Sequence, residues 1–324
     1  MERRPRVAIA GASGIGKHHA KWHHQVGANV VAFLGTTATS CRATAVELQE
    51  LFPFKGESFV EWGALLAAVR PDAVDICAPN YMHFDLTMAA LEAGCHVLCE
   101  KPLVWGSARS GEEQLAHAKA MVAKSVECDR MLGICTQYAV ALEHYLALYE
   151  PARGKLGRIE AFDVEMETLS RGRTRSPAQI WVDMGPHPLS LLLAWLPRGH
   201  IEPETLTTSF AASEARVEFV YAAPAGDCRC SVAVRDRDEG APVRRFGVNG
   251  VVVDCGGCAG PDGTYRSLLS LDDTQYVDTD FMHRLIQQFD TTCLRDGVPP
   301  VSGDTGLRNL ELLVQIMQKA EVLD

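Results

Sequence analysis

The sequence predicts a two-domain α/β protein, in which a doubly wound parallel sheet precedes a second α/β domain with a largely antiparallel open sheet. Three observations carry this prediction. Apolar runs typical of buried strands alternate with helical segments up to residue 137. A glycine-dense turn directly follows the first apolar run, and residues 205–277 are rich in Val, Thr, Tyr and short turns. We therefore expect domains at 1–137 and 138–324.

Composition limits the class of protein. The chain has 324 residues, enough for two domains, and its 47% hydrophobic and 22% charged residues are typical of a globular protein. A formal net charge of −10 argues against a nucleic-acid partner. We find no apolar run long enough to span a membrane, and the N-terminal apolar run stops at Gly11, too early for a signal peptide. We expect a cytoplasmic protein.

The chain contains 11 cysteines and no export signal, so reduced thiols are the expected state. One arrangement could bind zinc, if the thiols of Cys228, Cys230, Cys255 and Cys258 lay on neighbouring strands. Free cysteines in strands and a turn are the interpretation that we favour, and we predict no metal.

In the first domain, the expected strands and helices alternate along the chain. The strands are 6–10, 29–34, 73–78, 96–99 and 131–135, and the helices are 18–26, 38–52, 59–69, 83–93 and 110–128. This order implies a parallel sheet covered on both faces, with ligands bound beyond the carboxyl ends of the strands. Polar or glycine-rich residues stand at four such ends, at 11–16, 35–37, 79–80 and 100–101.

The glycine turn resembles the G-x-G-x-x-G pattern of dinucleotide-binding βαβ units. Gly11 and Gly16 fit its ends, whereas Ser13 takes the middle place and Gly14 is shifted by one. Glycines allow a tight turn and close approach of a pyrophosphate, which the free N–H groups of the following helix can bind. A plain turn between a strand and a helix is the alternative.

The second domain is expected to begin with a helix at 138–149 and a strand at 158–167. A short apolar helix follows at 188–196, then the antiparallel region 205–277 and two closing helices at 280–295 and 305–323. These helices would cover one face of the sheet. We expect the open face to be apolar and to be covered by another copy of the chain, which predicts a homodimer or homotetramer.

Several motifs together resemble the glucose–fructose oxidoreductase, inositol dehydrogenase and rhizopine-catabolism (Gfo/Idh/MocA) family. They are the turn 11–16 with His19, residues 77–80 with His83, the run 96–102 that contains Glu-Lys-Pro, the Asp-x-Gly-x-His motif at 183–187, and residues 298–302 before the last helix. The resemblance spans nearly the whole chain, and the Glu-Lys-Pro and Asp-x-Gly-x-His motifs are its most specific parts.

The resemblance implies a Rossmann domain followed by a domain whose open sheet is often used for oligomer contacts. Members of this family usually move a hydride between NAD(P) and a hydroxyl carbon of a sugar, polyol or related small molecule. The family's catalytic Lys, Asp and His correspond to Lys101, Asp183 and His187.

These residue types suit the oxidation of an alcohol. A neutral imidazole, with an ordinary pKa of about 6.5, can take the hydroxyl proton, which makes His187 the natural base. Asp183, four residues earlier, could orient the imidazole or the substrate. Lys101 could stabilise negative charge on the reacting oxygen. Each residue also has an ordinary interpretation: phosphate binding or a surface ion pair for Lys101, and a helix-end histidine between two prolines for His187.

The residues expected near the dinucleotide lie at the four strand ends. They are Gly11, Ser13, Gly14, Ile15, Gly35, Thr36, Pro79, Asn80, His83, Glu100 and Lys101. An acid at the end of the second strand would bind the ribose hydroxyls of NAD and repel a 2′-phosphate. This chain has Gly35-Thr36-Thr37 there, and Arg42 could reach a phosphate, so the prediction leans to NADP.

The chain departs from the family pattern at two further places. Ser190 replaces an acid that often follows the catalytic His by three residues, and residues 176–182 replace a glycine-rich lead into the Asp motif. Two other functions therefore stay open. One is a dinucleotide-binding sensor or scaffold without turnover, and the other is an enzyme that reduces and reoxidises NAD within one cycle.

Three lesser candidates complete the list. His19 and His23 lie one helical turn apart and could bind a metal, although the family has the first histidine without one. Arg171, Arg173 and Arg175 form either a solvated loop, which we favour, or a contact to an acidic ligand. Trp181 could stack on a sugar ring or fill the core.

Overall fold

The computed structural model describes residues 3–261, 264–295 and 297–321, and the chain divides into two compact units. The first unit comprises the chain up to Thr136 together with Met282–Leu310, and the second comprises Gln137–Phe281 and the end of the chain from Glu311. The contacts thus assign a C-terminal segment, 282–310, to the first unit. Each unit is described by itself.

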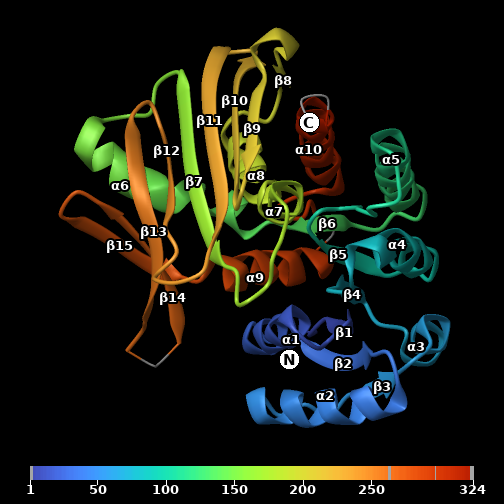
Figure 1. Cartoon of the computed structure of the whole chain (residues 1–324). Coiled ribbons are helices and arrows are strands. Elements are labelled where there is room, and N and C mark those ends of the chain that lie inside the picture. The colour runs from blue at the N-terminus through green and yellow to red at the C-terminus, as the bar shows by residue number, and fades with distance from the viewer. Residues whose placement is uncertain (1–2, 262–263, 296, 322–324) are drawn as a thin grey trace. The chain divides into compact units, whose positions relative to one another are not determined.

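The first unit contains a six-stranded sheet in the order β3-β2-β1-β4-β5-β6 (Figure 1), and all its strand pairs are parallel. Its strands are β1 (Arg6–Ala10), β2 (Asn29–Leu34), β3 (Glu57–Phe59), β4 (Ala73–Ile76), β5 (His96–Glu100) and β6 (Leu132–Cys135). The predicted doubly wound sheet is confirmed. The short strand β3 lies at its edge and was missing from the prediction, which placed residue 59 in a helix.

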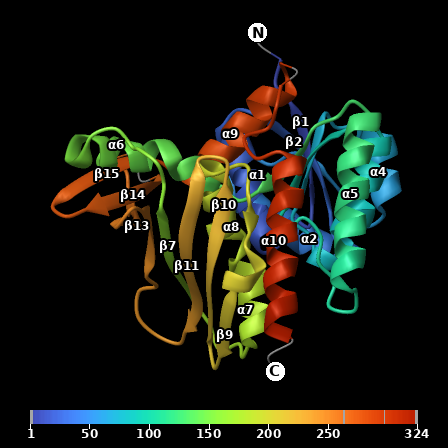
Figure 2. The ribbon, with the colours of Figure 1, turned by 90° about the horizontal axis from the view of Figure 1, so that it is seen from above.

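Helices connect the strands of this sheet. They are α1 (Ile15–Gln25), α2 (Ala38–Leu51), α3 (Trp62–Val69), α4 (His83–Glu92) and α5 (Gly111–Glu127), and α9 (Phe281–Cys293) joins them from the C-terminal segment. Helix α1 contacts α2, and helix α4 contacts both α3 and α5. Figure 2 shows α4 and α5 side by side. Because apolar side chains of β1 and β4 are completely buried between such layers, their sequences read as continuous apolar runs.

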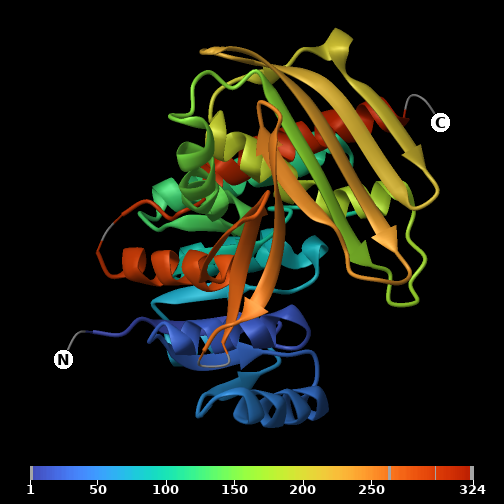
Figure 3. The same ribbon diagram turned by 90° about the vertical axis from the view of Figure 1, so that its left-hand side faces the viewer.

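The second unit is built on a nine-stranded sheet in the order β15-β14-β13-β12-β7-β11-β10-β8, with β9 paired to β10 (Figure 3). The strands are β7 (Ala161–Leu169), β8 (His200–Ile201), β9 (Thr207–Ala211), β10 (Glu214–Ala223), β11 (Gly226–Arg237), β12 (Arg244–Val248), β13 (Val251–Ala259), β14 (Tyr265–Leu271) and β15 (Thr274–Thr279). All these pairs are antiparallel except β7 with β11, so the largely antiparallel sheet is confirmed.

Four helices belong wholly or partly to this unit. They are α6 (Leu142–Arg153), α7 (Pro177–Met184), α8 (Pro186–Trp195) and the later part of α10 (Gly303–Glu321), which begins in the first unit. The prediction missed α7. Ser176 begins it with a capping box to Gln179, and Pro177 occupies its first turn, so the start signals were present in the sequence. No helix in the described part of the chain is long and apolar enough to cross a membrane.

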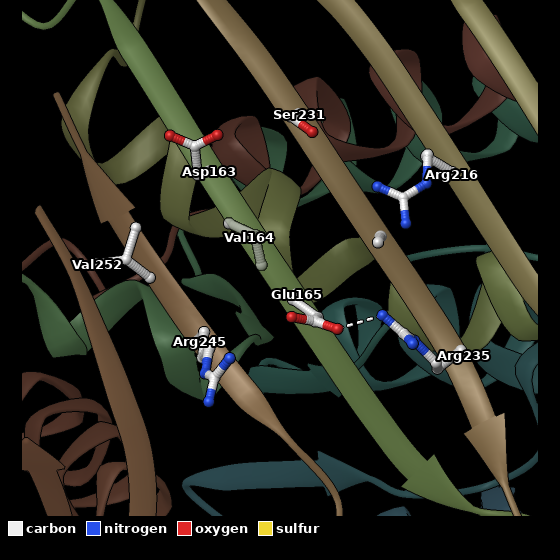
Figure 4. Close-up of a pocket in the computed structure, with 9 residues that line it drawn as sticks. Asp163, Val164, Glu165, Arg216, Ser231, Arg235, Arg245 and Val252 are labelled. Atoms are coloured by element: carbon white, nitrogen blue, oxygen red, sulfur yellow. Dashed lines mark hydrogen bonds and ion pairs between the residues drawn. The ribbon is translucent and has the colours of Figure 1, made fainter. Parts of the chain in front are cut away.

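The outer face of the second sheet is charged, and the expected apolar face is therefore wrong. Along β7, β10 and β11 the apolar side chains alternate inward and are buried. The other face is hollowed over the middle strands (Figure 4), where it carries Asp163, Glu165, Arg216, Ser231, Arg235 and Arg245. Arg235 pairs with Glu165, and Arg245 donates to Asp254 at 2.6 Å. Paired charges of this kind are stable in water without a covering layer.

Candidate cofactor and active site

The carboxyl ends of four neighbouring strands place the predicted cofactor residues along one edge of the first sheet. Gly11 follows β1, Gly35 follows β2, Pro79 follows β4 after a short loop, and Glu100 ends β5. Backbone hydrogen bonds join these ends, from the Gly11 N–H to the Leu34 carbonyl at 3.0 Å and from the Gly35 N–H to the Phe59 carbonyl at 2.9 Å. The structure thus brings together the strand ends that the sequence singled out.

The glycine turn has the geometry that a phosphate loop requires. Gly11 has a φ of +90°, and a Cβ there would lie 3.0 Å from the carbonyl oxygen of Cys77. A Cβ on Gly16 would lie only 2.0 Å from the carbonyl oxygen of Gly11, so this glycine lets α1 pack directly against the turn. Helix α1 has neither a side-chain cap nor an acidic residue in its first turn, so its N-terminus suits an anion.

The end of β2 lies beside the start of α2. Thr37 caps this helix, because its hydroxyl accepts from the Ser40 N–H at 3.1 Å. Thr36 is exposed, and Arg42 is exposed on the same helix, where it donates to the Thr39 hydroxyl at 3.1 Å. The first turn of α2 contains no acid.

His83 joins the loops that follow β4 and β5. Its Nε2 lies 2.9 Å from the carbonyl oxygen of Ala78, and its Nδ1 lies 3.0 Å from that of Pro102. The side chain is completely buried, and burial lowers its pKa. We predicted His83 near the cofactor, and the structure shows that its side chain is used to hold these two loops. Lys101 follows β5 directly, and its backbone N–H donates to Glu100 Oε2 at 3.1 Å.

The two histidines of α1 share a buried carboxylate. Asp75 Oδ2 lies 2.8 Å from His19 Nδ1 and 3.0 Å from His23 Nε2, and all three side chains are fully buried. His19 belongs to two groups that could hold a metal ion, one with Asp75 and Cys77 and the other with Glu100 and Cys135. Burial raises the pKa of both thiols, which opposes the thiolate form that binds metals. We interpret these residues as a hydrogen-bonded cluster, and the sequence missed Asp75 as its centre.

In the second unit, Asp183 and His187 lie on consecutive helices that are almost continuous. Helix α7 ends at Met184, Gly185 keeps right-handed helical dihedrals, and α8 begins at Pro186. The four-residue spacing therefore corresponds to one helical turn. The imidazole of His187 meets the ring of Tyr138 edge-on, with ring centroids 5.3 Å apart.

Arg175 holds the Asp183 carboxylate, a contact that the sequence analysis missed. Its Nη1 donates to Asp183 Oδ2 at 2.6 Å, and its other nitrogens bind Asp236 of β11 in a bidentate pair. The favoured solvated loop is therefore wrong for Arg175, whereas Arg171 and Arg173 are exposed. The hydrogen bonds that Arg175 donates to Asp236 and Asp183 raise its pKa. Asp183 is thus held by an ion pair, with about half of its side chain exposed.

Two other expectations are settled by packing. Trp181 is completely buried and is a core residue, so it does not stack on a ligand. All 11 cysteines are free thiols. Cys228 and Cys230 lie on β11, whereas Cys255 and Cys258 lie on β13, and the strands β7 and β12 separate the two pairs. The four thiols do not lie on neighbouring strands, so the zinc hypothesis for them fails.

The sheet order, the glycine turn and the four strand ends define a dinucleotide-binding protein of the Rossmann type. Residues 5–129 match the model of the Gfo/Idh/MocA oxidoreductase family with its NAD-binding Rossmann fold. This match lies within the first unit. The second unit is compared through solved structures.

Three similar proteins illustrate the relationship. D-glucoside 3-dehydrogenase of Escherichia coli is 62% identical over 12% of this chain and 11% of its own length. Levoglucosan dehydrogenase of Pseudarthrobacter phenanthrenivorans is 34% identical over 36% of this chain and 28% of its own length. The alignments thus cover less than a third of either relative. An inositol dehydrogenase homolog of Azotobacter vinelandii, solved with NAD+, has the same fold: TM-score 0.73 and 18% identity over 99% of this chain and 96% of that one.

Replacing Gly16 by alanine should abolish dinucleotide binding, because its Cβ would collide with the Gly11 carbonyl and displace α1 from the turn. Gly63→Ala is the matched control, since the same methyl group on α3 would meet nothing within 4 Å. Calorimetric titration with NAD+ and NADP+ measures both variants. Wild-type affinity in Gly16→Ala would contradict the proposed phosphate loop.

Proposed function

We propose that this protein is an NAD(P)-dependent oxidoreductase that moves a hydride between the nicotinamide and a hydroxyl or carbonyl carbon of a sugar, polyol or related small molecule. The observation that carries the proposal is Lys101, which follows β5 at the cofactor edge of a Rossmann sheet of this family. The relatives named for a glucoside, levoglucosan and inositol support the substrate class.

A bound nicotinamide would accept or donate the hydride, and the chain's own residues would handle the proton and the charge. We assign to Lys101 the stabilisation of negative charge on the reacting oxygen. His187 takes the hydroxyl proton, and Asp183 orients the imidazole or the substrate. Arg175, anchored on Asp236, keeps Asp183 in one position.

Two other functions compete with this proposal. A dinucleotide-binding sensor would need the cofactor edge and nothing more. An enzyme that reduces and reoxidises NAD within one cycle would need the same residues and yield no net NADH. The presence of Lys101, Asp183 and His187 together favours catalysis over sensing.

His187→Ala should lower turnover about 10²–10⁴-fold, the usual contribution of a general base. Dinucleotide affinity should barely change, because His187 belongs to the other unit. A panel of sugars and polyols first identifies a substrate, and steady-state kinetics then compare His187→Ala with His200→Ala, which alters an exposed histidine of the same unit. Full turnover in His187→Ala would remove His187 from the mechanism and favour the sensor.

We further propose NADP as the preferred cofactor. The corner after β2 lacks an acid and offers the Thr36 hydroxyl, the start of α2 and Arg42. Side-by-side calorimetric titration should show tighter binding of NADP+ than of NAD+, and Arg42→Gln should remove the difference because a 2′-phosphate would lose its cation. Binding of NAD+ that is tenfold tighter would contradict the preference.

We also propose a homo-oligomer, a dimer or tetramer. The resemblance supports self-association through the second sheet, and the charges on its outer face predict that such contacts are sensitive to salt. Light scattering at micromolar concentration should give an oligomeric mass at low salt and a smaller mass at high salt. A monomeric mass at both salt concentrations would contradict the proposal.

A further inference from the structure

Five side chains of the first unit form an unbroken network of contacts. The network runs from the cofactor edge of the sheet to the opposite edge, near the start of β1. Glu100 Oε1 lies 3.2 Å from His19 Nε2, and His19 Nδ1 lies 2.8 Å from Asp75 Oδ2. The same Asp75 oxygen lies 3.0 Å from His23 Nε2, and His23 Nδ1 lies 2.9 Å from Asp290 Oδ2. Three of the four ring nitrogens hydrogen-bond a carboxylate oxygen, whereas His19 Nε2 lies at ion-pair distance from Glu100 without a hydrogen bond.

Four separate elements contribute side chains to this network. Helix α1 supplies both histidines from one face, because residues four apart lie one turn from each other. Asp75 comes from the middle of β4, Glu100 from the end of β5, and Asp290 from α9, more than 260 positions after His23. The network thus connects the C-terminal segment of the unit to its cofactor edge.

Acidic side chains and histidines alternate along the network. Burial alone would lower the pKa of His23, but Asp290 and Asp75 raise it to about 9. The pKa of His19 is likewise raised well above its usual value, against its burial, by its neighbours Cys77, Asp75 and Cys135. The two imidazolium rings hold the pKa of Asp75 below its usual range in spite of its burial. Acidic side chains therefore alternate with the two imidazole rings along this series of contacts. Burial raises the pKa of the neighbouring thiols Cys77, Cys135 and Cys293.

The two ends of the network, Glu100 and Asp290, lie in different surroundings. At the inner end, the second oxygen of Glu100 accepts from the backbone N–H of Lys101 at 3.1 Å. At the outer end, Asp290 lines a groove with Gly27 and the arginines Arg3, Arg4 and Arg295. This groove is next to the start of β1, at the edge of the sheet opposite the cofactor residues.

We propose that His23 and Asp290 are positioning residues of the cofactor site: with His19 and Asp75 they form a brace that fixes the Glu100 carboxylate and, through it, the backbone of Lys101. A buried ionic network of this size is not needed for stability alone, since apolar side chains of similar volume often stabilise a fold equally well. A role in positioning the cofactor site explains why the network ends on Glu100. The inference rests on the dinucleotide-binding part of the proposed function.

The variant Asp290→Asn tests the brace, because the amide keeps an acceptor for His23 but lacks the negative charge. Dinucleotide affinity, measured by calorimetry, should fall roughly tenfold, within the range of couplings seen in a shared polar network. The backbone amide resonance of Lys101 should shift in the protein without ligand, because its acceptor Glu100 moves. Asp290→Glu should recover part of the affinity, since it restores the charge.

The pH dependence provides a second readout. His23 is faced by Asp75 from β4, Asp290 from α9 and His19 from its own helix, and its raised pKa means that the cation is lost as pH rises through about 9. Wild-type affinity should therefore decline as pH rises through 9. His23→Gln should bind more weakly at pH 7 and lack this step, whereas any titration of Lys101 itself would be common to both proteins.

The controls separate positioning from stability. Asp72→Asn removes an acid that pairs with Arg3 and accepts the Arg6 N–H at 2.9 Å but does not belong to the network. This variant should leave the dinucleotide affinity and the Lys101 resonance unchanged. The double variant His23→Gln/Asp290→Asn removes one charge of each sign and should recover thermal stability but not affinity. Lower stability in Asp290→Asn with wild-type affinity and an unmoved Lys101 resonance would overturn the brace. If the wild-type protein binds no dinucleotide, the proposed function fails, and the Lys101 resonance alone decides about the brace.

Discussion

The first unit depends on one buried carboxylate, Asp75, which lies between two histidines in the centre of the parallel sheet. An unpaired charge at this position would cost several kcal/mol, so β4, α1 and α9 have to assemble with their charges matched. Once they are matched, His19 faces Glu100 at the end of β5, and the strand ends that form the cofactor edge are set relative to α1. Packing of the helix and placement of the site are thus consequences of the same contacts.

The second unit uses the same principle with different residues. Arg175 is held by Asp236 on a strand and in turn holds Asp183 on α7, so a residue of the sheet determines where the proposed catalytic acid stands. In the second unit Asp183 touches a charged partner that comes from elsewhere in the chain, and in the first unit Glu100, next to Lys101, does so. Substitution of these partners would alter function without altering a residue that contacts a ligand.

Much of the fold follows from local patterns, and the supporting contacts do not. The alternation of apolar runs and helical segments predicts five of the six strands of the first sheet, and the glycine turn and the Glu-Lys-Pro run predict its cofactor edge. Asp75 could have been noticed, because a charge inside the buried run 73–76 needs a partner. Its partner Asp290 is far away in sequence and has no local signal. The charged face of the second sheet could also have been predicted, because charged residues alternate along β7, β10 and β11. The sequence-based prediction instead assumed that the open face was apolar.

The most direct test of this account is to locate the protons around Asp75. Neutron diffraction from a deuterium-exchanged crystal near pH 7 would show whether His19 and His23 carry deuterium on all four ring nitrogens. The account predicts that both rings are fully protonated, with one deuterium in each gap between a ring nitrogen and a carboxylate. A neutral ring at either position, with an empty gap toward Asp75, would contradict the alternating charges on which the brace depends.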